Sequence, residues 1–178
     1  RVVATGFSNS VTASHCVSLG MQSYDTQQRV SEKVAHAKIG VIALPHTNLF
    51  LQGRDTHSAP PRGLTAIAAL RRAGVRVAVG ADNLQDPFNP IGRGDPLESA
   101  GLAILTAHQL PEDAFRSVSS VARDIMGLAD AAPKVGSIAD LMLTPSATIR
   151  EAIASAPPRT LVIRHGHVTF SRLVQPKR

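Results

Sequence analysis

Short hydrophobic runs alternate with amphipathic stretches over the first eighty residues. Runs at 11–16, 41–44 and 75–80 are rich in β-branched and small side chains, which predicts three buried strands. Between these runs, apolar residues recur at helical spacing over 26–38 and 64–73, and a glycine follows each stretch. The order strand, helix, strand, helix, strand is typical of parallel α/β proteins.

The segments that follow predict further helices. A polar, proline-rich segment at 46–63 is expected to be a loop. Helices are expected over 96–109 and 111–127, and Pro111 occupies the first position of the second one, where proline is tolerated because that N–H has no helical partner.

From residue 135 onward the pattern changes to short strands and turns. The sequence His-Gly-His at 165–167 is expected to form the turn of a hairpin. The predicted elements are strands at 138–143, 160–164 and 168–170 and a short helix at 149–154. We therefore expect a small β-rich segment after the α/β part.

The length and composition limit the class of protein. The chain has 178 residues, of which 43% are apolar, so it can form a packed core. It is too short for a complete (β/α)8 barrel, which needs about 250 residues. Because no apolar run reaches the roughly 18 residues of a membrane span, no membrane partner is predicted.

Charge and cysteine content exclude two further classes. The net charge of +6 raises the question of nucleic acid, but the basic residues are scattered and only 3% of residues are aromatic, so no nucleic-acid partner is predicted. The single cysteine, Cys16, excludes an intrachain disulfide and fits a cytoplasmic protein. Because the first residue is Arg1, the chain is expected to begin inside a longer gene product.

Polar residues follow each predicted strand of the α/β part. His15 follows the first strand, His46 to Asn48 the second, and Asp82 and Asn83 the third. In parallel α/β proteins the functional side chains lie at the carboxyl ends of the strands. An imidazole and a carboxylate there supply part of the ligand set of a zinc or iron ion. The histidines at 165 and 167 are either a ligand pair or an exposed turn.

Several of these residues have a second, structural interpretation. Asn48 either lines a pocket or stabilises a loop, and Asn83 either positions a loop over a ligand or satisfies turn amides. Arg54 either grips an anionic or carbonyl group of a ligand or pairs with Asp55 or Asp86.

Collinear motifs carry a resemblance to a known family. They are SHC at 14–16, MQSY at 21–24, NLFLQGR at 48–54, GADN at 80–83, DPF at 86–88, PIG at 90–92, GSIADL at 136–141 and VIRHGHV at 162–168. In this order they resemble the second half of cytosine deaminase-like members of the amidohydrolase superfamily. The resemblance implies the last three βα units of a (β/α)8 (TIM) barrel over residues 1–130 and part of a small β-sandwich over 131–178.

The resemblance also implies roles for individual residues. Asp82 matches the aspartate that ends the eighth barrel strand, a metal ligand and proton shuttle, and His15 matches the histidine that ends the sixth strand, beside the reacting centre. Asn48, Arg54 and Asn83 are the candidate substrate-binding residues. The implied cofactor is a divalent metal, zinc or iron, in the intact protein, and the implied substrate is a small cytosine-like heterocycle.

Two departures from the family limit these implications. The family motif at strand eight is Gly-His-Asp-Asp, whereas residues 80–83 read GADN, so triazine-type rings and cyclic amides are alternative substrates. Nothing upstream of His15 supplies the His-x-His pair, the further histidine or the glutamate that the family needs, so this chain alone is predicted to be inactive.

A second hypothesis comes from a different class. The chain is then a noncatalytic α/β fragment that docks on a complementary chain, either the missing N-terminal half or another copy in a homo-oligomer, because an open half-barrel leaves strand edges unpaired.

Overall fold

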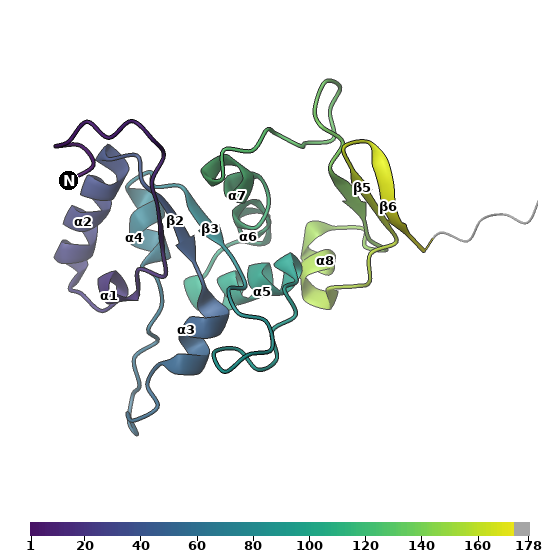
Figure 1. Cartoon of the computed structure of the whole chain (residues 1–178). Helices are drawn as coiled ribbons and strands as arrows, with labels where there is room; N and C mark the ends of the chain where they lie inside the picture. Colours follow the sequence, from purple (N-terminus) through teal and green to yellow (C-terminus); the bar gives the residue numbers. More distant parts are fainter. Residues whose placement is uncertain (173–178) are drawn as a thin grey trace, which may run out of the picture.

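A computed structural model describes residues 1–172 and contains two separate sheets (Figure 1). The first sheet is parallel and has the order β1-β2-β3, with β1 at Thr12–Ser14, β2 at Gly40–Ala43 and β3 at Val77–Val79. In its register Ala13 pairs with Val41, and Val41 pairs with Val77. All three residues of β3 are buried, as expected for a strand covered on both faces.

Helices connect and cover these strands. They are α1 (Val17–Gly20), α2 (Tyr24–His36), α3 (Pro45–Leu51), α4 (Ile67–Arg72), α5 (Pro96–Ala107), α6 (Pro111–Ser117), α7 (Ser120–Ile125) and α8 (Ile149–Ser155). Helix α2 begins where the Ser23 side chain accepts a hydrogen bond from the Thr26 amide, which satisfies one of the free N–H groups of the first turn. Helices α1, α2 and α4 lie on the N-terminal side of the sheet in Figure 1, and α5 to α7 lie on the other.

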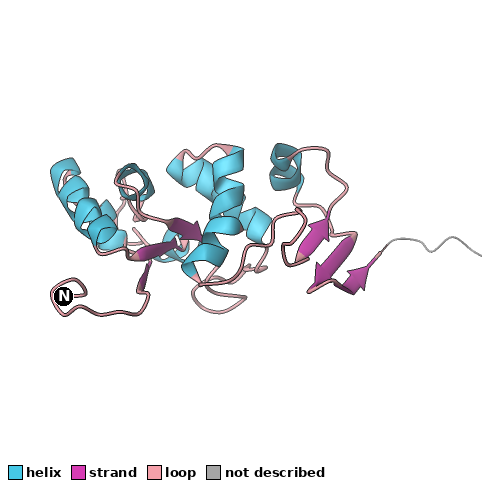
Figure 2. Cartoon of the chain, turned by 90° about the horizontal axis from the view of Figure 1, so that it is seen from above, coloured by secondary structure: helices cyan, strands magenta, loops and turns pink. Residues whose placement is uncertain are grey.

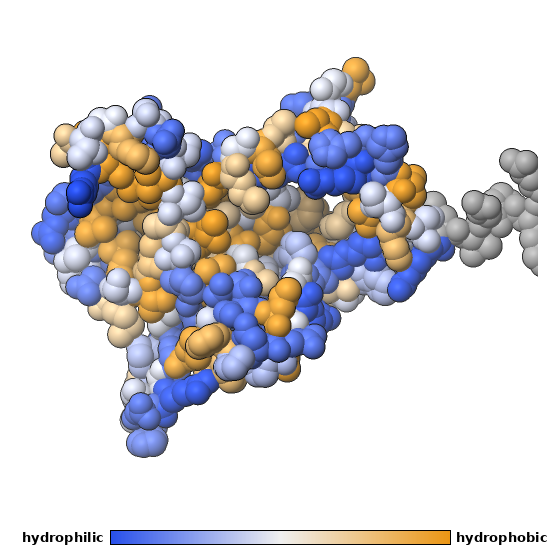
Figure 3. Space-filling model, in the orientation of Figure 1, coloured by the Kyte–Doolittle hydropathy of each residue, from blue (hydrophilic) through white to orange (hydrophobic). Residues whose placement is uncertain are grey.

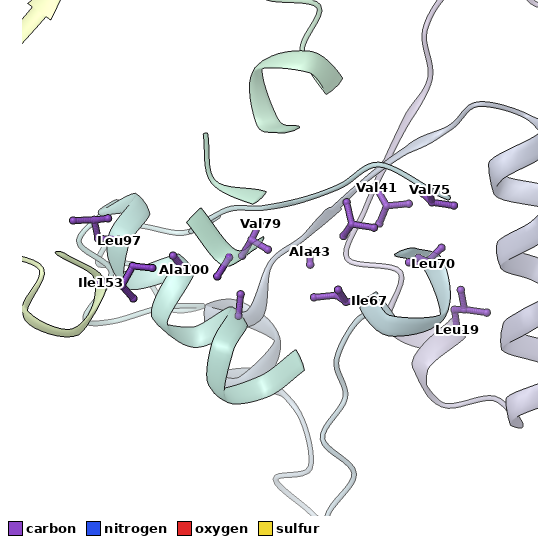
Figure 4. Close-up of a cluster of buried hydrophobic side chains, with 13 residues drawn as sticks. Leu19, Val41, Ala43, Ile67, Leu70, Val75, Val79, Leu97, Ala100 and Ile153 are labelled. Atoms are coloured by element: carbon purple, nitrogen blue, oxygen red, sulfur yellow. The ribbon is translucent and has the colours of Figure 1, made fainter. Parts of the chain in front are cut away.

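One hydrophobic cluster runs through the α/β part and reaches α8 (Figure 4). Val41 of β2, Leu70 of α4 and Leu97 of α5 are each 1% exposed. Burying a side chain of this size contributes about 1.5–3 kcal/mol. Because Ile153 of α8 belongs to the same cluster, the second segment packs onto the first, through the contacts of α8 with α5 and α6.

The second sheet is antiparallel and lies at the end of the molecule farthest from the N-terminus (Figure 2). It has the order β4-β5-β6, with β4 at Leu141–Leu143, β5 at Leu161–Arg164 and β6 at His167–Ser171. His165 and Gly166 both have positive φ and form the turn between β5 and β6. All five residues of β6 are exposed.

The α/β alternation, the order of the three strands and the final hairpin are confirmed. The expected burial of the first strand was wrong: Thr12 and Ser14 of β1 are exposed, because β1 lies at the edge of the sheet and pairs only with β2 in the described residues. Two further expectations were wrong. Residues 46–63 were expected to be a loop, but α3 occupies the start of this segment. Pro45 does not only end the preceding strand; it is also the first residue of this helix, a position that suits proline. The single helix expected at 111–127 is two helices, since the helical conformation is interrupted between Ser117 and Ser120.

Other expectations are met only in part or stay predictions. The mixed α/β class is established, whereas the partial barrel and the division at residue 130 remain predictions. The last six residues of the segment predicted at 131–178 lie outside the described residues. Over residues 1–172, no helix is both long enough and apolar enough to cross a membrane.

Candidate active site

His15 directly follows β1 and has a left-handed backbone. Its φ is 61°, and that of Cys16 is 50°, a conformation that costs a non-glycine residue about 1–2 kcal/mol. The His15 amide donates to the Ile42 carbonyl at 3.0 Å, so the residue stays attached to β2 while its side chain turns out of the strand. Such backbone outliers persist only where surrounding contacts hold them, and they cluster at functional sites.

Asp82 lies in the loop after β3 and faces His15. Its φ is 65°, so it too departs from the strand in a left-handed conformation. The Nε2 atom of His15 lies 3.6 Å from the Oδ2 atom of Asp82, and the two side chains are 40% and 29% exposed. The structure therefore brings the two residues together across the sheet, at a position that solvent and small molecules can reach.

Asn48 of α3 holds the other ring nitrogen of His15. Its Oδ1 atom lies 2.9 Å from His15 Nδ1, and since an amide oxygen only accepts, Nδ1 carries the proton in this arrangement. In a neutral His15 ring, Nε2, which faces Asp82, is then the nitrogen with the free electron pair. Asn48 is only 8% exposed and its amide nitrogen is buried, so its side chain binds His15 and does not face solvent.

Asn83, the next candidate residue, has protein partners for both side-chain groups. Its Oδ1 atom accepts from the Thr47 hydroxyl at 2.8 Å, and its Nδ2 atom donates to Asp86 at 2.6 Å. Asp86 in turn accepts from the backbone amides of Phe88 and Asn89. The loop after β3 is thus ordered by its own polar side chains: Asp86 satisfies the turn amides, whereas Asn83 binds Asp86 and connects the loop to Thr47.

Helix α3 connects the loops that carry His15 and Asp82. Its neighbouring residues Thr47 and Asn48 bind Asn83 and His15, respectively. The sequence analysis includes Thr47 among the polar residues that follow the second strand but predicts no role for it, because the segment is expected to be a loop. The signal that points to a helix here is Pro45 followed by seven residues without glycine or a further proline, since proline is favoured in the first turn of a helix.

Arg54 lies away from these contacts. Its Nε atom donates to the Phe50 carbonyl at 3.2 Å, and its guanidinium lies 4.6 Å from the centre of the Phe50 ring. Within residues 1–172 it forms no ion pair with Asp55 or Asp86.

His46 and Glu98 form a second polar contact, between α3 and α5. Their side chains approach to 3.7 Å, and that of His46 is 8% exposed. Burial lowers the pKa of His46, and the nearby Glu98 carboxylate opposes this shift only in part. The pair connects the start of α3 to α5, and Glu98 also contacts Arg93 at 3.4 Å. Sequence analysis gave no indication of Glu98.

The donor chemistry around His15 and Asp82 fits part of a metal site. An imidazole nitrogen and a carboxylate oxygen are ligands that zinc and iron accept. In the described part of the chain, no group of three or more His, Cys, Asp or Glu side chains is close enough to hold an ion. His165 and His167 are exposed in the β5–β6 hairpin, where Asp140 accepts from the His165 amide.

A cavity lies elsewhere in the molecule. It has a volume of about 710 Å³ and lies between α5 to α7 on one side and β4 and α8 on the other. Its wall includes Phe115, Leu141 and Ile149, but neither His15 nor Asp82. Figure 3 shows apolar residues exposed on the face of the molecule that carries the first sheet and the junction with the second.

A parallel sheet with an imidazole and a carboxylate meeting at its strand ends is typical of α/β enzymes, in which such side chains converge on one site. Comparison with known proteins makes this class specific. Residues 2–170 match the model of the amidohydrolase family, and the chain belongs to that family.

Relatives with defined activities cover most of the chain. A pterin deaminase of Rhizobium rhizogenes is 36% identical over 171 residues, which are 94% of this chain and 39% of that protein. The structure of 5-methylcytosine deaminase from Klebsiella pneumoniae, liganded with 5-fluorocytosine, has a TM-score of 0.87 at 27% identity and covers 99% of this chain and 44% of that one.

A third relative is named for a different reaction. The structure of N-isopropylammelide isopropylaminohydrolase from Burkholderia multivorans has a TM-score of 0.78 at 28% identity, over 94% of this chain and 41% of that one. The chain thus spans about two fifths of the length of the relatives it matches. The family resemblance seen in the sequence is confirmed.

Proposed function

We propose that this chain forms part of the active site of a metal-dependent amidohydrolase that hydrolytically deaminates a nitrogen heterocycle. The observation that carries the proposal is the approach of His15 Nε2 to Asp82 Oδ2, 3.6 Å apart, from the ends of two strands of one sheet. The two residues are separated by 67 positions in the chain, and both have the strained backbone that functional sites tolerate.

The names of the relatives support the reaction class. A pterin deaminase and a 5-methylcytosine deaminase release an amino group from a ring, and an isopropylaminohydrolase removes a substituted amine. All three reactions break a C–N bond of a nitrogen heterocycle. The proposed substrate is either a cytosine-like or a triazine-type ring. Both are kept because residues 80–83 depart from the cytosine deaminase motif and because both side-chain groups of Asn83 bind the protein.

His15 and Asp82 are the residues that would hold a divalent zinc or iron ion in the intact protein. When bound, such an ion makes water acidic enough to ionise near pH 7. The two side chains supply one nitrogen and one oxygen donor, so a complete site needs further ligands. Completion by the rest of an intact protein is part of this proposal, and on this basis the isolated chain is expected to show no enzyme-like turnover.

The chain's own side chains divide the remaining work. Asp82 offers carboxylate oxygens that accept a proton from the attacking water and deliver it to the leaving nitrogen. His15 keeps its ring at the reacting centre, and the Asn48 contact at Nδ1 orients that ring so that Nε2 faces Asp82. For Arg54 to bind substrate, its guanidinium must leave the Phe50 ring.

A chimera tests this proposal. The part of the Rhizobium pterin deaminase that aligns with this chain is replaced by residues 1–172, and ammonia release is measured with pterin, 5-methylcytosine and N-isopropylammelide after zinc or iron loading. We expect release from one or more of the ring amines and its loss, by at least about a hundred-fold, in Asp82→Asn and His15→Gln chimeras.

Matched measurements make the result interpretable. The Asp55→Asn chimera, altered at an exposed aspartate in the loop after α3, is the control and should keep the activity. Metal content is measured for every variant. A folded, metal-loaded chimera whose activity survives Asp82→Asn contradicts the proposal.

The β1 edge favours a second candidate function. In the described part of the chain β1 pairs only with β2, and Thr12 and Ser14 are exposed, so its outer edge offers unpaired backbone groups. A noncatalytic fragment would use this edge to dock on a complementary chain or on another copy of itself. Sedimentation velocity of the isolated chain tests this role: a monomer at all concentrations argues against self-association. A cytoplasmic location, supported by the single cysteine, belongs to either proposal.

A further inference from the structure

We propose that Thr65 is a positioning residue for His15, a role that rests on the proposed function of His15. Thr65 is 6% exposed, and its hydroxyl donates a hydrogen bond to the backbone carbonyl of His15, 50 residues earlier in the chain. Nothing in the sequence pattern points to this residue, which lies in the segment before α4.

The bond acts on the part of His15 that is least supported by regular structure. The His15 carbonyl lies between two residues in the left-handed conformation, at φ 61° and 50°, and has therefore left the parallel ladder that β1 forms with β2. A carbonyl that is shielded from water must accept a hydrogen bond from another group, or folding pays for its lost hydration. The Thr65 hydroxyl is that donor. Its hydrogen bond stabilises the left-handed conformation of His15, because in this conformation the His15 carbonyl has a partner.

His15 is then held at three points by three different parts of the chain. Its amide donates to Ile42 of β2 at 3.0 Å, its Nδ1 contacts Asn48 of α3 at 2.9 Å, and its carbonyl accepts from Thr65. Two backbone anchors and one ring anchor leave little freedom about the Cα–Cβ bond. The remaining ring atom, Nε2, faces Asp82.

The segment that carries Thr65 is itself closely packed. A Cβ placed on Gly20, at the end of α1, would lie 2.0 Å from the Leu64 carbonyl oxygen, so the chain at 64 runs directly against α1. On the other side, the Ile67 amide donates to the Thr65 carbonyl at 2.8 Å. Because threonine is branched at Cβ, its hydroxyl also has few rotamers to choose from. Thr65 is thus a rigid donor.

The consequence for the proposed chemistry follows from geometry. If the His15 carbonyl loses its donor, the left-handed turn relaxes, and the ring moves relative to both Asn48 and Asp82. A displacement of about 1 Å at a reacting group costs on the order of a hundred-fold in rate. Thr65 acts only through His15 and is therefore not a catalytic residue.

Nuclear magnetic resonance of the histidine rings tests the proposal in the 178-residue chain itself. The ring ¹⁵N shifts of His15, assigned with a His15→Gln variant, are expected to report the tautomer with the proton on Nδ1. In Thr65→Val the tautomer ratio should shift towards equal populations by about two- to ten-fold, the range that one hydrogen bond supports. Thr65→Ser, which keeps the hydroxyl, should restore the original shifts.

A matched threonine provides the control. Thr106 also donates its hydroxyl to a backbone carbonyl, that of Leu102 at 2.6 Å, but within α5. Thr106→Val should leave the His15 ring shifts unchanged. If a folded Thr65→Val chain has the same His15 shifts as the unmodified chain, or if Thr106→Val moves them equally, the proposal is wrong.

A measurement on the unmodified chain covers the case in which Thr65→Val does not fold. The Thr65 hydroxyl proton is expected to exchange with water slowly enough to be observed, and exchange as fast as that of an exposed threonine overturns the proposal. These readouts need neither metal nor turnover. An inactive chimera with a fixed His15 ring therefore contradicts the proposed function alone, whereas a mobile ring contradicts the role of Thr65 alone.

Discussion

The ion pair between Asp95 and Arg159 joins the two segments of the chain, and its removal should lower the free energy of unfolding. Arg159 Nη1 donates to Asp95 Oδ2 at 2.9 Å, and Nη2 donates to Oδ1, so the pair is bidentate. The side chains are 15% and 20% exposed. Asp95 also caps α5, because Oδ1 accepts from the Leu97 amide at 2.9 Å.

Three substitutions separate these two contributions. Asp95→Asn keeps a good capping residue but removes the charge, and should cost about 1.5–3 kcal/mol, the value of a hydrogen bond to a charged group. Asp95→Ala also removes the cap and should cost about 1 kcal/mol more. Arg159→Met should resemble Asp95→Asn, since it removes the same pair from the other side.

Urea unfolding at pH 7, followed by circular dichroism, measures these values. The double variant Asp95→Asn, Arg159→Met should lose little more than either single variant, which gives a coupling of about 1–2 kcal/mol. Additive losses, or a loss below about 0.5 kcal/mol in Asp95→Ala, would refute this account of the junction.

The same pair predicts a pH dependence. Burial alone raises the pKa of Asp95, but the hydrogen bonds from Arg159 and the Leu97 amide, together with the charges of Arg159 and Arg93, outweigh it and lower that pKa overall. A carboxyl whose pKa is lower in the folded state contributes its full stability above its unfolded pKa of about 3.9. The stability difference between the unmodified chain and Asp95→Asn should therefore be constant near pH 7 and shrink as the pH falls below about 4.

Three further predictions concern packing and reactivity. Burial raises the pKa of the Cys16 thiol above its usual value, so its alkylation rate should still be rising with pH above about 9, and a plateau near pH 8 would contradict this. Leu70→Ala should cost about 2–5 kcal/mol in urea unfolding, whereas Leu105→Ala, at a 70% exposed site, should stay within about 0.5 kcal/mol. Gly101→Ala should stabilise α5 by about 0.5–1 kcal/mol, because the added Cβ meets only an ordinary contact at 3.8 Å. Gly20→Ala should destabilise the folded chain, because its Cβ would lie 2.0 Å from a backbone carbonyl oxygen. Equal changes in the free energy of unfolding for the two variants would refute the comparison.

Helix α3 explains why the loops after β1 and β3 are held as one unit. Thr47 and Asn48 are adjacent in sequence and bind the loops of Asp82 and His15, respectively. His46, the residue before them, contacts Glu98 of α5. A shift of α3 along its axis would therefore move both candidate catalytic side chains, which makes this helix the structural support of the proposed site.

Much of the α/β framework follows from local sequence. The apolar runs at the positions of β1, β2 and β3, separated by amphipathic stretches, are enough to predict the parallel order, because β2 and β3 are buried and the helices between the strands pack apolar residues against them. The polar residues at the strand ends follow from the same pattern, so His15 and Asp82 were identifiable as neighbours in space before any coordinates. The hairpin at the end of the chain was equally local.

Tertiary structure decided which side chains support that pair. Asn48, called a substrate-binding candidate, binds the His15 ring, Arg54 lies on Phe50, and Thr65 reaches a carbonyl 50 residues away. Periodicity records only whether a position faces a core or solvent, and it holds no information on which distant backbone group a buried hydroxyl will meet. That pairing depends on how α1, α3 and the segment before α4 pack around β1, because a buried polar group must find its partner in the packed chain rather than in its own neighbourhood.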